Sequence, residues 1–347
     1  MIDVKQDILR ELSNNLLVLE GMPAKIAEEV TECLIEASLR GVDSHGIRLL
    51  SHYVDVIRSG RINKNPQITI DQTAASTAVL DADHTFGHYA ASLAIKKSID
   101  MATTSGAGFV SVKNSTHCSA MSYYSLQAAR KGMIGFGVTH STSMMVPTNG
   151  KEPYLGTNAI TFAFPCYGED PICLDMATTQ LAWNKVLRAR ENNQDLDGKW
   201  AVDKDGVPTQ SPIDATGLLP AGLYKGFGLG LVVEALSAIL TGGPYGPNLV
   251  GMFESSTLPE KRKLSHFVGA IDISKFINVD FFMKNMSIMV NEIRKTRSIK
   301  QGIPVFVSGD PEKIIQKHRE THGIPLDDII ISKFRDLSKN YNLNFNY

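Results

Sequence analysis

Several features that mark particular classes of protein are scarce in this sequence. Only four of its 347 residues are cysteines, and no two of them form a CxxC pair, so the chain lacks the cysteine density of a disulfide-stabilised fold. Positive and negative side chains nearly cancel, with 35 Lys and Arg against 36 Asp and Glu. At a net charge of −1 there is no overall positive field, and we expect neither nucleic acid nor a membrane as a partner.

Long apolar runs are missing as well. The N-terminal stretch MIDVKQDILRELSNN alternates charged and apolar residues, unlike a signal peptide. The run LGLVVEALSAIL is shorter than the ~20 residues of a membrane span, and Gly242, Gly243 and Pro244 close it. Hydrophobic residues still make up 43% of the chain, which is typical of a globular protein. We expect a soluble protein, and the scattered cysteines suit a reducing, cytoplasmic compartment.

Helical spacing dominates the first sixty residues. Apolar residues recur three or four positions apart in two stretches, namely Ile8, Leu12 and Leu16, then Ile26, Val30, Cys33 and Ala37. Gly41 suits the left-handed residue that ends the second helix, and Asp43 and Ser44 are candidate N-caps of a third helical stretch. These patterns predict a helical subdomain over residues 1–75.

From residue 76 the helical spacing gives way to short β-branched runs separated by glycine. The part of the chain from 108 to 140 predicts a strand at Gly108–Val112, a helix at Ala120–Arg130 and a strand at Met133–His140. Helical spacing returns after residue 280. We predict an α/β (α+β) protein: residues 76–305 form a mixed α/β domain for cofactor and substrate, and residues 306–347 join the helical subdomain.

His117 is the first candidate for chemistry, because it lies where a predicted strand ends and a helix begins. Ligands often bind at that edge of an open α/β sheet. A histidine in the first helical turn faces the positive end of the helix dipole, which leaves a neutral ring able to act as a general base. A capping or packing role explains the position equally well. The adjacent Cys118 lacks a visible third partner for a thiol nucleophile.

Glycines at alternate positions follow Lys225 and open an apolar helix. Backbone amides, the helix dipole and one ammonium group would converge there on an anion such as a cofactor phosphate. The spacing matches neither GxGxxG nor GxxxxGK[ST], and close packing of the helix explains the glycines about as well.

Other polar residues have a structural interpretation first. Those at the margins of apolar strands are expected to close hydrogen bonds at strand ends; they are Asn158, Asp175, Thr178 and Thr179. Two histidine pairs, His84 with His88 and His318 with His322, have the spacing of helical metal ligands. Neither pair has an HExxH arrangement or a supporting ligand set, so we expect no metal.

Ordered motifs over nearly the whole length resemble those of the malate/L-lactate dehydrogenase family, which also includes ureidoglycolate, sulfolactate and 2,3-diketogulonate enzymes. In chain order they are RGVDSHG, YVDVIRSGRINKNP, NSTH, QAARKGMIGFGVTHS, MVPTNGKEPYLGTN, LDMATT, WAVDKDGVPT and LLPAGLYKGFGLGL. The resemblance implies a non-Rossmann fold, a homodimer whose active site is shared between subunits, and NAD or NADP as the hydride carrier, with NAD favoured.

The resemblance also implies roles for individual residues. His117 corresponds to the catalytic histidine, which takes the hydroxyl proton of the substrate or returns it. The substrate-binding residues would be Ser44, His45 and Arg48. The cofactor-binding residues would be Ser141, Asp175, Met176, Ala177, Lys225, Val268, Gly269 and Ala270.

The chain departs from the family pattern near the expected site. Ser119, Ala159 and Asn184 replace a glycine, a proline and a glycine, and the arginine after SHG is Arg48, one position before its usual place at Leu49. The implied activity is an NAD(P)-dependent dehydrogenase of a small 2-hydroxy acid, with malate first. A ureidoglycolate dehydrogenase and a catalytically silent relative that binds a metabolite are the alternatives.

Overall fold

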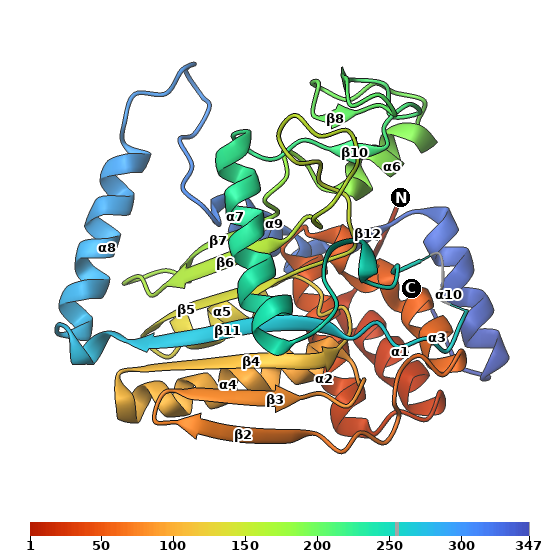
Figure 1. Ribbon diagram of the computed structural model, residues 1–347, viewed down its shortest axis with the longest axis horizontal. Coiled ribbons are helices and arrows are strands. Elements are labelled where there is room, and N and C mark those ends of the chain that lie inside the picture. The colour runs from red at the N-terminus through yellow and green to blue at the C-terminus, as the bar shows by residue number, and fades with distance from the viewer. Residues whose placement is uncertain (254–256, 347) are drawn as a thin grey trace.

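A layer of helices and a large mixed sheet make up most of the computed structural model, which describes residues 1–253 and 257–346. The helical layer contains helices α1 (Gln6–Leu19), α2 (Ala24–Leu39), α3 (Leu50–Arg58) and α10 (Asp328–Asn340), with the short 3-10 turns η1 (Asp43–His45) and η2 (Ile47–Leu49) between α2 and α3 (Figure 1). Strand β1 (Ile2–Val4) pairs antiparallel with β12 (Ile324–Leu326), which ties the two ends of the chain together. The two helices predicted at the N-terminus are confirmed, and Gly41 has the expected positive φ.

One buried apolar cluster fills this layer. It takes side chains from residues 4–62 and 324–334 and from Phe86, and Leu16, Leu34 and Phe334 are fully buried in it. The apolar residues that recur at helical spacing in the sequence therefore face the core of this layer. The division of the chain near residue 75 stays a prediction, although β2 (Thr69–Ala74), which precedes that point, already belongs to the large sheet.

The large sheet has seven strands in the order β2-β3-β4-β11-β5-β6-β7. Their bounds are β2 (Thr69–Ala74), β3 (Thr77–Asp81), β4 (Ala107–Ser115), β11 (Leu264–Asp272), β5 (Met133–Thr139), β6 (Ala159–Phe164) and β7 (Ile172–Met176). The predicted strand, helix and strand over 108–140 are confirmed as β4, α5 (Ser122–Ala129) and β5. The distant strand β11 lies between β4 and β5 and is antiparallel to both.

Helices α4 (Gly87–Ser105) and α5 cover one face of the sheet, and α7 (Tyr224–Glu234) crosses the other (Figure 1). Glycine lets α4 approach the sheet closely, since a Cβ on Gly108 of β4 would lie 2.1 Å from the carbonyl oxygen of Ser98 in α4. The opposite face carries a row of phenylalanines whose rings pack from strand to strand: Phe109, Phe267, Phe136, Phe162 and Phe164. Helix α7 continues into a short π-helical turn, η3 (Ala235–Ile239).

The remaining elements form a small lobe and two outer helices. The lobe combines α6 (Trp183–Glu191) with a three-stranded sheet of β8 (Ala201–Val202), β9 (Pro208–Thr209) and β10 (Gly217–Leu218). Helices α8 (Val279–Arg294) and α9 (Asp310–His322) follow β11, and the 3-10 turns η4 (Gly246–Asn248) and η5 (Ile273–Lys275) flank it. No helix within the described residues is long and apolar enough to span a membrane.

The position of Gly269 in β11 gives a test of packing in the sheet. A Cβ there would lie 2.3 Å from Cε1 of Phe136 and 2.8 Å from Cδ1 of Phe109. We expect Gly269→Ala to lower the free energy of unfolding by about 1–3 kcal/mol through overpacking. Urea unfolding followed by circular dichroism measures it. The control is Gly228→Ala in α7, where a Cβ meets nothing within 4 Å. That variant should be more stable by about 0.5–1 kcal/mol. Equal effects from the two substitutions would contradict the packing argument.

Candidate functional site

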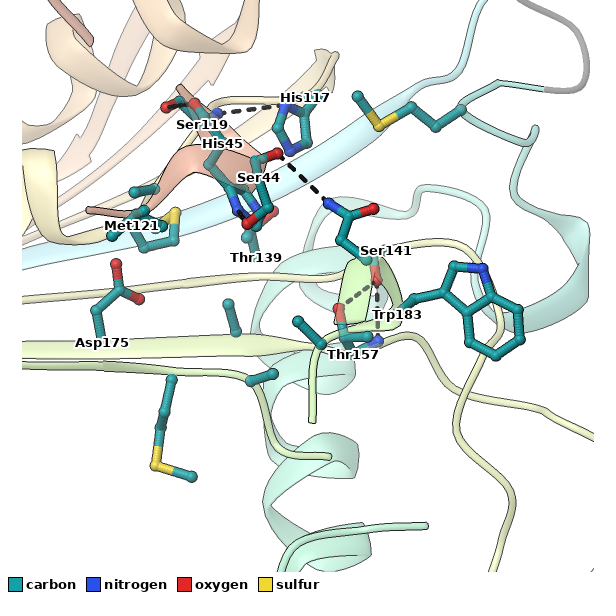
Figure 2. A pocket seen from close by; sticks show the side chains of 18 of the residues that line it. Ser44, His45, His117, Ser119, Met121, Thr139, Ser141, Thr157, Asp175 and Trp183 are labelled. Atoms are coloured by element: carbon teal, nitrogen blue, oxygen red, sulfur yellow. Dashed lines mark hydrogen bonds between the residues drawn. The ribbon is translucent and has the colours of Figure 1, made fainter. Parts of the chain in front are cut away.

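A cavity of about 310 Å³ opens at one edge of the large sheet, next to the helical layer and α6. Segments that follow β4, β5 and β7 line it, together with the segments that precede β6 and β11. Because β4, β5 and β7 run in the same direction, their carboxyl ends meet at this edge. Figure 2 shows side chains from both layers facing the cavity, with His117 and His45 near one another and Asp175 and Trp183 on opposite sides. We predicted His117 at this edge from its position between a strand and a helix in the sequence.

His117 lies in the loop between β4 and α5 and is held there by Tyr53 of α3. The Tyr53 hydroxyl is 2.7 Å from Nδ1 of His117, and the backbone N–H of Ser119 donates to the same nitrogen from 3.4 Å. A tyrosine hydroxyl can donate or accept, so it can stay bonded to Nδ1 as the ring gains or loses a proton. The His45 ring stacks on His117, with centroids 5.4 Å apart.

The pKa of His117 is well below 6.5, so the ring is neutral at physiological pH. Desolvation by burial is the largest cause of the lowered pKa. The positive charge of Arg262 acts in the same direction, as would a proton on His45 or His88. The lowered pKa agrees with the neutral ring predicted from the sequence, but the predicted cause, the helix dipole, was wrong. His117 precedes Ser122, the first residue of α5, by five positions and therefore lies outside the first helical turn, where the dipole acts.

Ser44 and His45 form the η1 turn on the helical side of the cavity. Ser44 Oγ is 2.9 Å from Nδ1 of His45, and the Ser119 hydroxyl donates to the backbone carbonyl of His45 over 2.7 Å. Desolvation lowers the pKa of His45 to about 4. The prediction that Asp43 or Ser44 caps a helix was wrong, because Asp43 instead pairs with Arg319 of α9 over 2.5 Å.

Ser141 and Thr157 line the sheet side of the cavity and are bonded to each other. The Thr157 backbone N–H donates to Ser141 Oγ over 2.9 Å, and the two hydroxyl oxygens are 3.1 Å apart. The buried Asn158 supports them: its Oδ1 accepts from the Ser141 N–H, and its Nδ2 donates to Glu234 over 2.7 Å. The expected strand-end role of Asn158 is therefore confirmed.

Asp175, Met176 and Ala177 follow one another along the cavity wall at the end of β7. The Asp175 side chain reaches solvent through the cavity but is otherwise surrounded by protein, and desolvation raises its pKa to about 6. The Ser122 N–H donates to Asp175 Oδ2 over 2.7 Å, which acts against that rise. Ser119, Ala159 and Asn184, the three departures from the family pattern, also line the cavity.

The structure does not bring the other expected residues to this cavity. Arg48 pairs with Asp327, the N-cap residue of α10, while Leu49 lines the wall. Lys225 is exposed at the start of α7. The residues 268–270 lie in the middle of β11, the central strand, where neighbouring strands and both layers of side chains cover them.

Sequence reasoning missed several residues that line the cavity or hold the site. Tyr53 falls on the apolar stripe of α3 and looked like a core residue, which it also is. Arg262 stands in the charged run EKRK, which gives no sign of a buried guanidinium. Trp183 and Arg40 also line the cavity. No group of three or more His, Cys, Asp or Glu side chains in the described part of the chain could hold a metal ion.

Buried neutral histidines make stability depend on pH. Desolvation lowers the pKa of His88 to about 3 and that of His266 to about 3, against 6.5 for an ordinary histidine. Above pH 6.5 neither the folded nor the unfolded state binds the proton, so these groups have no effect. Below pH 6.5 only the unfolded state binds the proton. The free energy of unfolding therefore decreases by about 1.4 kcal/mol for each histidine with every pH unit of acidification.

We expect His88→Leu to reduce the dependence of the unfolding free energy on pH between pH 6 and 4.5. The reduction should be about 1.4 kcal/mol per pH unit, the contribution of one histidine, measured by urea unfolding. Neither ring nitrogen of His88 has a hydrogen-bond partner among the described atoms, so this substitution breaks no such bond. The exposed His318→Gln on α9 is the control and should leave the slope unchanged. A full slope in His88→Leu would contradict the neutral assignment.

The whole chain is similar to known dehydrogenases in sequence and in fold. Ureidoglycolate dehydrogenase (NAD(+)) of Escherichia coli K12 is 34% identical over 327 residues, covering 94% of this chain and 93% of that protein. The malate dehydrogenase of Pyrococcus abyssi is 34% identical over 348 residues, covering 97% and 94%. The crystal structure of malate dehydrogenase from Entamoeba histolytica superposes with a TM-score of 0.93 at 30% identity, covering 99% of each chain. The family profile described as malate/L-lactate dehydrogenase matches residues 4–335, and the chain belongs to this family of dehydrogenases, as its motifs predicted.

Proposed function

We propose that this protein interconverts a small 2-hydroxy acid and the corresponding 2-oxo acid, with a nicotinamide nucleotide as the hydride carrier. The observation that carries the proposal is the neutral imidazole of His117, which lines a cavity together with Ser44, His45 and Asp175. A histidine must be unprotonated before it can act as a general base, and the lowered pKa of His117 meets that condition at neutral pH. The relatives named as malate and ureidoglycolate dehydrogenases support the substrate class.

The cavity residues fit a nicotinamide nucleotide. Methionines 121, 144, 176 and 252 give apolar surface that suits a flat heteroaromatic ring, and Ser141, Thr157 and Asp175 offer polar groups for amide and ribose hydroxyls. We propose Ser141, Asp175, Met176 and Ala177 as cofactor contacts. We favour NAD over NADP, because the ureidoglycolate dehydrogenase of Escherichia coli is named as an NAD(+) enzyme.

In the oxidative direction, His117 would act as the tautomer that carries its proton on Nδ1 and donates it to the Tyr53 hydroxyl, so that Nε2 can take the hydroxyl proton of the substrate. The longer hydrogen bond from the Ser119 N–H to Nδ1 belongs to the other tautomer. The bound nicotinamide supplies the acceptor for the hydride that leaves the same carbon. In the reductive direction, His117 would return the proton to the carbonyl oxygen. Ser44 and His45, fixed to each other and to Ser119, would orient the substrate beside the reacting carbon.

We put malate first among substrates and ureidoglycolate second, since relatives of both names match at 34% identity over more than nine-tenths of the chain. Both compounds carry a carboxylate next to the reacting hydroxyl group. They differ in the second substituent of the reacting carbon, a carboxymethyl group in malate and a ureido group in ureidoglycolate. The third possibility, a silent metabolite-binding relative, rests on the changes at Ser119, Ala159 and Asn184.

The test of this function is a substrate panel with purified protein, followed by the absorbance of the reduced nicotinamide. We expect turnover of at least one of malate, ureidoglycolate, sulfolactate and lactate, with kcat/KM for each compound measured with NAD and with NADP. The variant His117→Gln should keep cofactor binding and lose roughly 10²- to 10⁴-fold in kcat, the usual cost of removing a general base. No turnover with any compound favours the silent relative, and near-normal kcat in His117→Gln removes the base assignment.

We also propose that two copies of the chain associate and share the active site. Apolar side chains of α7 and its flanks face solvent: Leu223 is 59% exposed, Tyr224 67%, Leu231 56% and Val232 49%. Exposed apolar surface of this extent is typical of protein interfaces. Lys225 stands among these residues, outside its own chain's cavity, so a second chain is the route by which it would meet a cofactor.

Mixing two inactive variants tests this sharing. In a heterodimer of His117→Ala and Lys225→Ala chains, one cavity has both defects and the other has a native His117 and, from the other chain, a native Lys225. We therefore expect dissociation and reassembly of the mixture to restore up to about half of the activity per heterodimer if Lys225 serves the opposite cavity. If Lys225 serves its own chain, or the protein stays monomeric in sedimentation, no activity returns.

A further inference from the structure

The charges on the cavity wall bear on how a substrate carboxylate is held. Two positively charged side chains that cannot lose their proton line the cavity among the described residues, Arg40 and Arg262, and both are nearly fully buried, at 3% and 4% exposure. The arginine that the SHG motif suggested, Arg48, is not one of them, because its guanidinium pairs with Asp327. The apolar side chain of Leu49 lines the cavity instead.

Arg40 lies toward Asp175. Burial raises the pKa of Asp175 and of Cys173, both on β7, and the positive charge of Arg40 opposes that rise at both groups. Its Nη1 donates to Gln316 of α9 over 3.3 Å and lies 3.6 Å from Asp170. This arginine therefore belongs to the part of the wall that we assign to the cofactor, and it is tied to outer elements there.

Arg262 lies toward His117. It lines a second, very small cavity whose wall also includes His117 and Tyr53. Arg262 and His117 therefore lie together between the two cavities. Its charge acts on the pKa values of His117, His52 and His266 in the direction of lowering them. Of these three histidines, His117 lines the larger cavity together with Arg262.

The guanidinium of Arg262 has a fixed orientation. Its Nε donates to the backbone carbonyl of Val250 over 3.0 Å, and one terminal nitrogen donates to the Thr142 hydroxyl over 3.1 Å. Thr142 follows β5 and itself lines the cavity. A buried guanidinium that is held in place recognises a carboxylate more strongly than a mobile surface one, because little side-chain freedom is lost on binding.

We propose that Arg262 binds the carboxylate of the substrate beside His117, in place of the arginine after SHG, and that Thr142 is a positioning residue for it. The inference rests on the proposed function, in that the ligand is the carboxylate of a 2-hydroxy or 2-oxo acid. The motif suggested a carboxylate subsite at Arg48 in the helical layer, but Arg48 pairs with Asp327. The proposed subsite lies instead in the segment that precedes β11. The reacting carbon, one bond from the carboxylate, then lies within reach of His117.

The test compares Arg262→Gln, Arg262→Lys and Thr142→Val with the native protein. The readout is the ratio of kcat/KM for the best 2-oxo acid of the panel to that for its primary amide, which has no charge. In Arg262→Gln we expect kcat/KM for the acid to fall roughly 30- to 1000-fold and the acid-to-amide preference to collapse, as when one partner of a buried charge pair is removed. Arg262→Lys should keep part of the preference, and Thr142→Val should raise KM for the acid with a smaller effect on kcat.

Two further variants separate the alternatives. Arg48→Gln removes the arginine suggested by the motif, and we expect the acid-to-amide preference to persist in it. Lys263→Gln removes the same charge from the adjacent, exposed residue and controls for long-range electrostatics. Circular dichroism and titration with reduced nicotinamide nucleotide check that each variant folds and binds cofactor. Because Thr142→Val leaves the buried arginine in place, the proposal stays testable if Arg262→Gln does not fold.

An unchanged preference in Arg262→Gln, or its loss in Arg48→Gln, overturns the proposal. If the native protein turns over no acid, the proposed function fails first, and the subsite is then tested by binding alone. Calorimetric titration with oxalate in the presence of reduced nicotinamide nucleotide should show binding to the native protein that weakens at least about 30-fold in Arg262→Gln. Equal binding of oxalate to both proteins overturns the subsite independently of any activity.

Discussion

The hydrogen bond between the Tyr53 hydroxyl and Nδ1 of His117 joins the two layers of the molecule at the cavity. Tyr53 comes from α3 of the helical layer, whereas His117 comes from the loop that follows β4 of the sheet. Neither layer alone would bury the imidazole, and burial is the largest cause of its lowered pKa. Packing of the helices against the sheet therefore sets the protonation state on which a general base depends.

The order of strands determines which loops meet around that histidine. Insertion of β11 between β4 and β5 brings the segment 262–264 to the same edge as the loops that follow β4 and β5. The central strand can accept neighbours and covering side chains on all sides partly because residue 269 is glycine, over which the rings of Phe109 and Phe136 lie. A cavity wall built from segments more than a hundred residues apart is thus a consequence of sheet topology.

Local patterns predicted the parts of the molecule that local interactions determine. The helices at 6–19 and 24–39 and the strand, helix and strand over 107–139 follow from residue spacing, and His117 follows from its place between a strand and a helix. Two of the failures share one cause, a distant partner. Asp43 pairs with Arg319 instead of capping a helix, and β11 enters the sheet beside strands that precede it by some 130 residues. No spacing rule within a short window contains such pairings.

Charge at the cavity is divided between groups that titrate and groups that do not. His45, His88 and His117 are neutral near pH 7, because burial lowers the pKa of each. Arg262 keeps its charge at any pH that the fold survives, and that charge disfavours protonation of His117. A carboxylate bound at Arg262 would offset the effect, so the ligand that needs its proton removed would itself make His117 a better acceptor. An uncharged analogue would bring no such compensation, and discrimination between acids and their neutral analogues would then arise in the proton transfer as well as in binding.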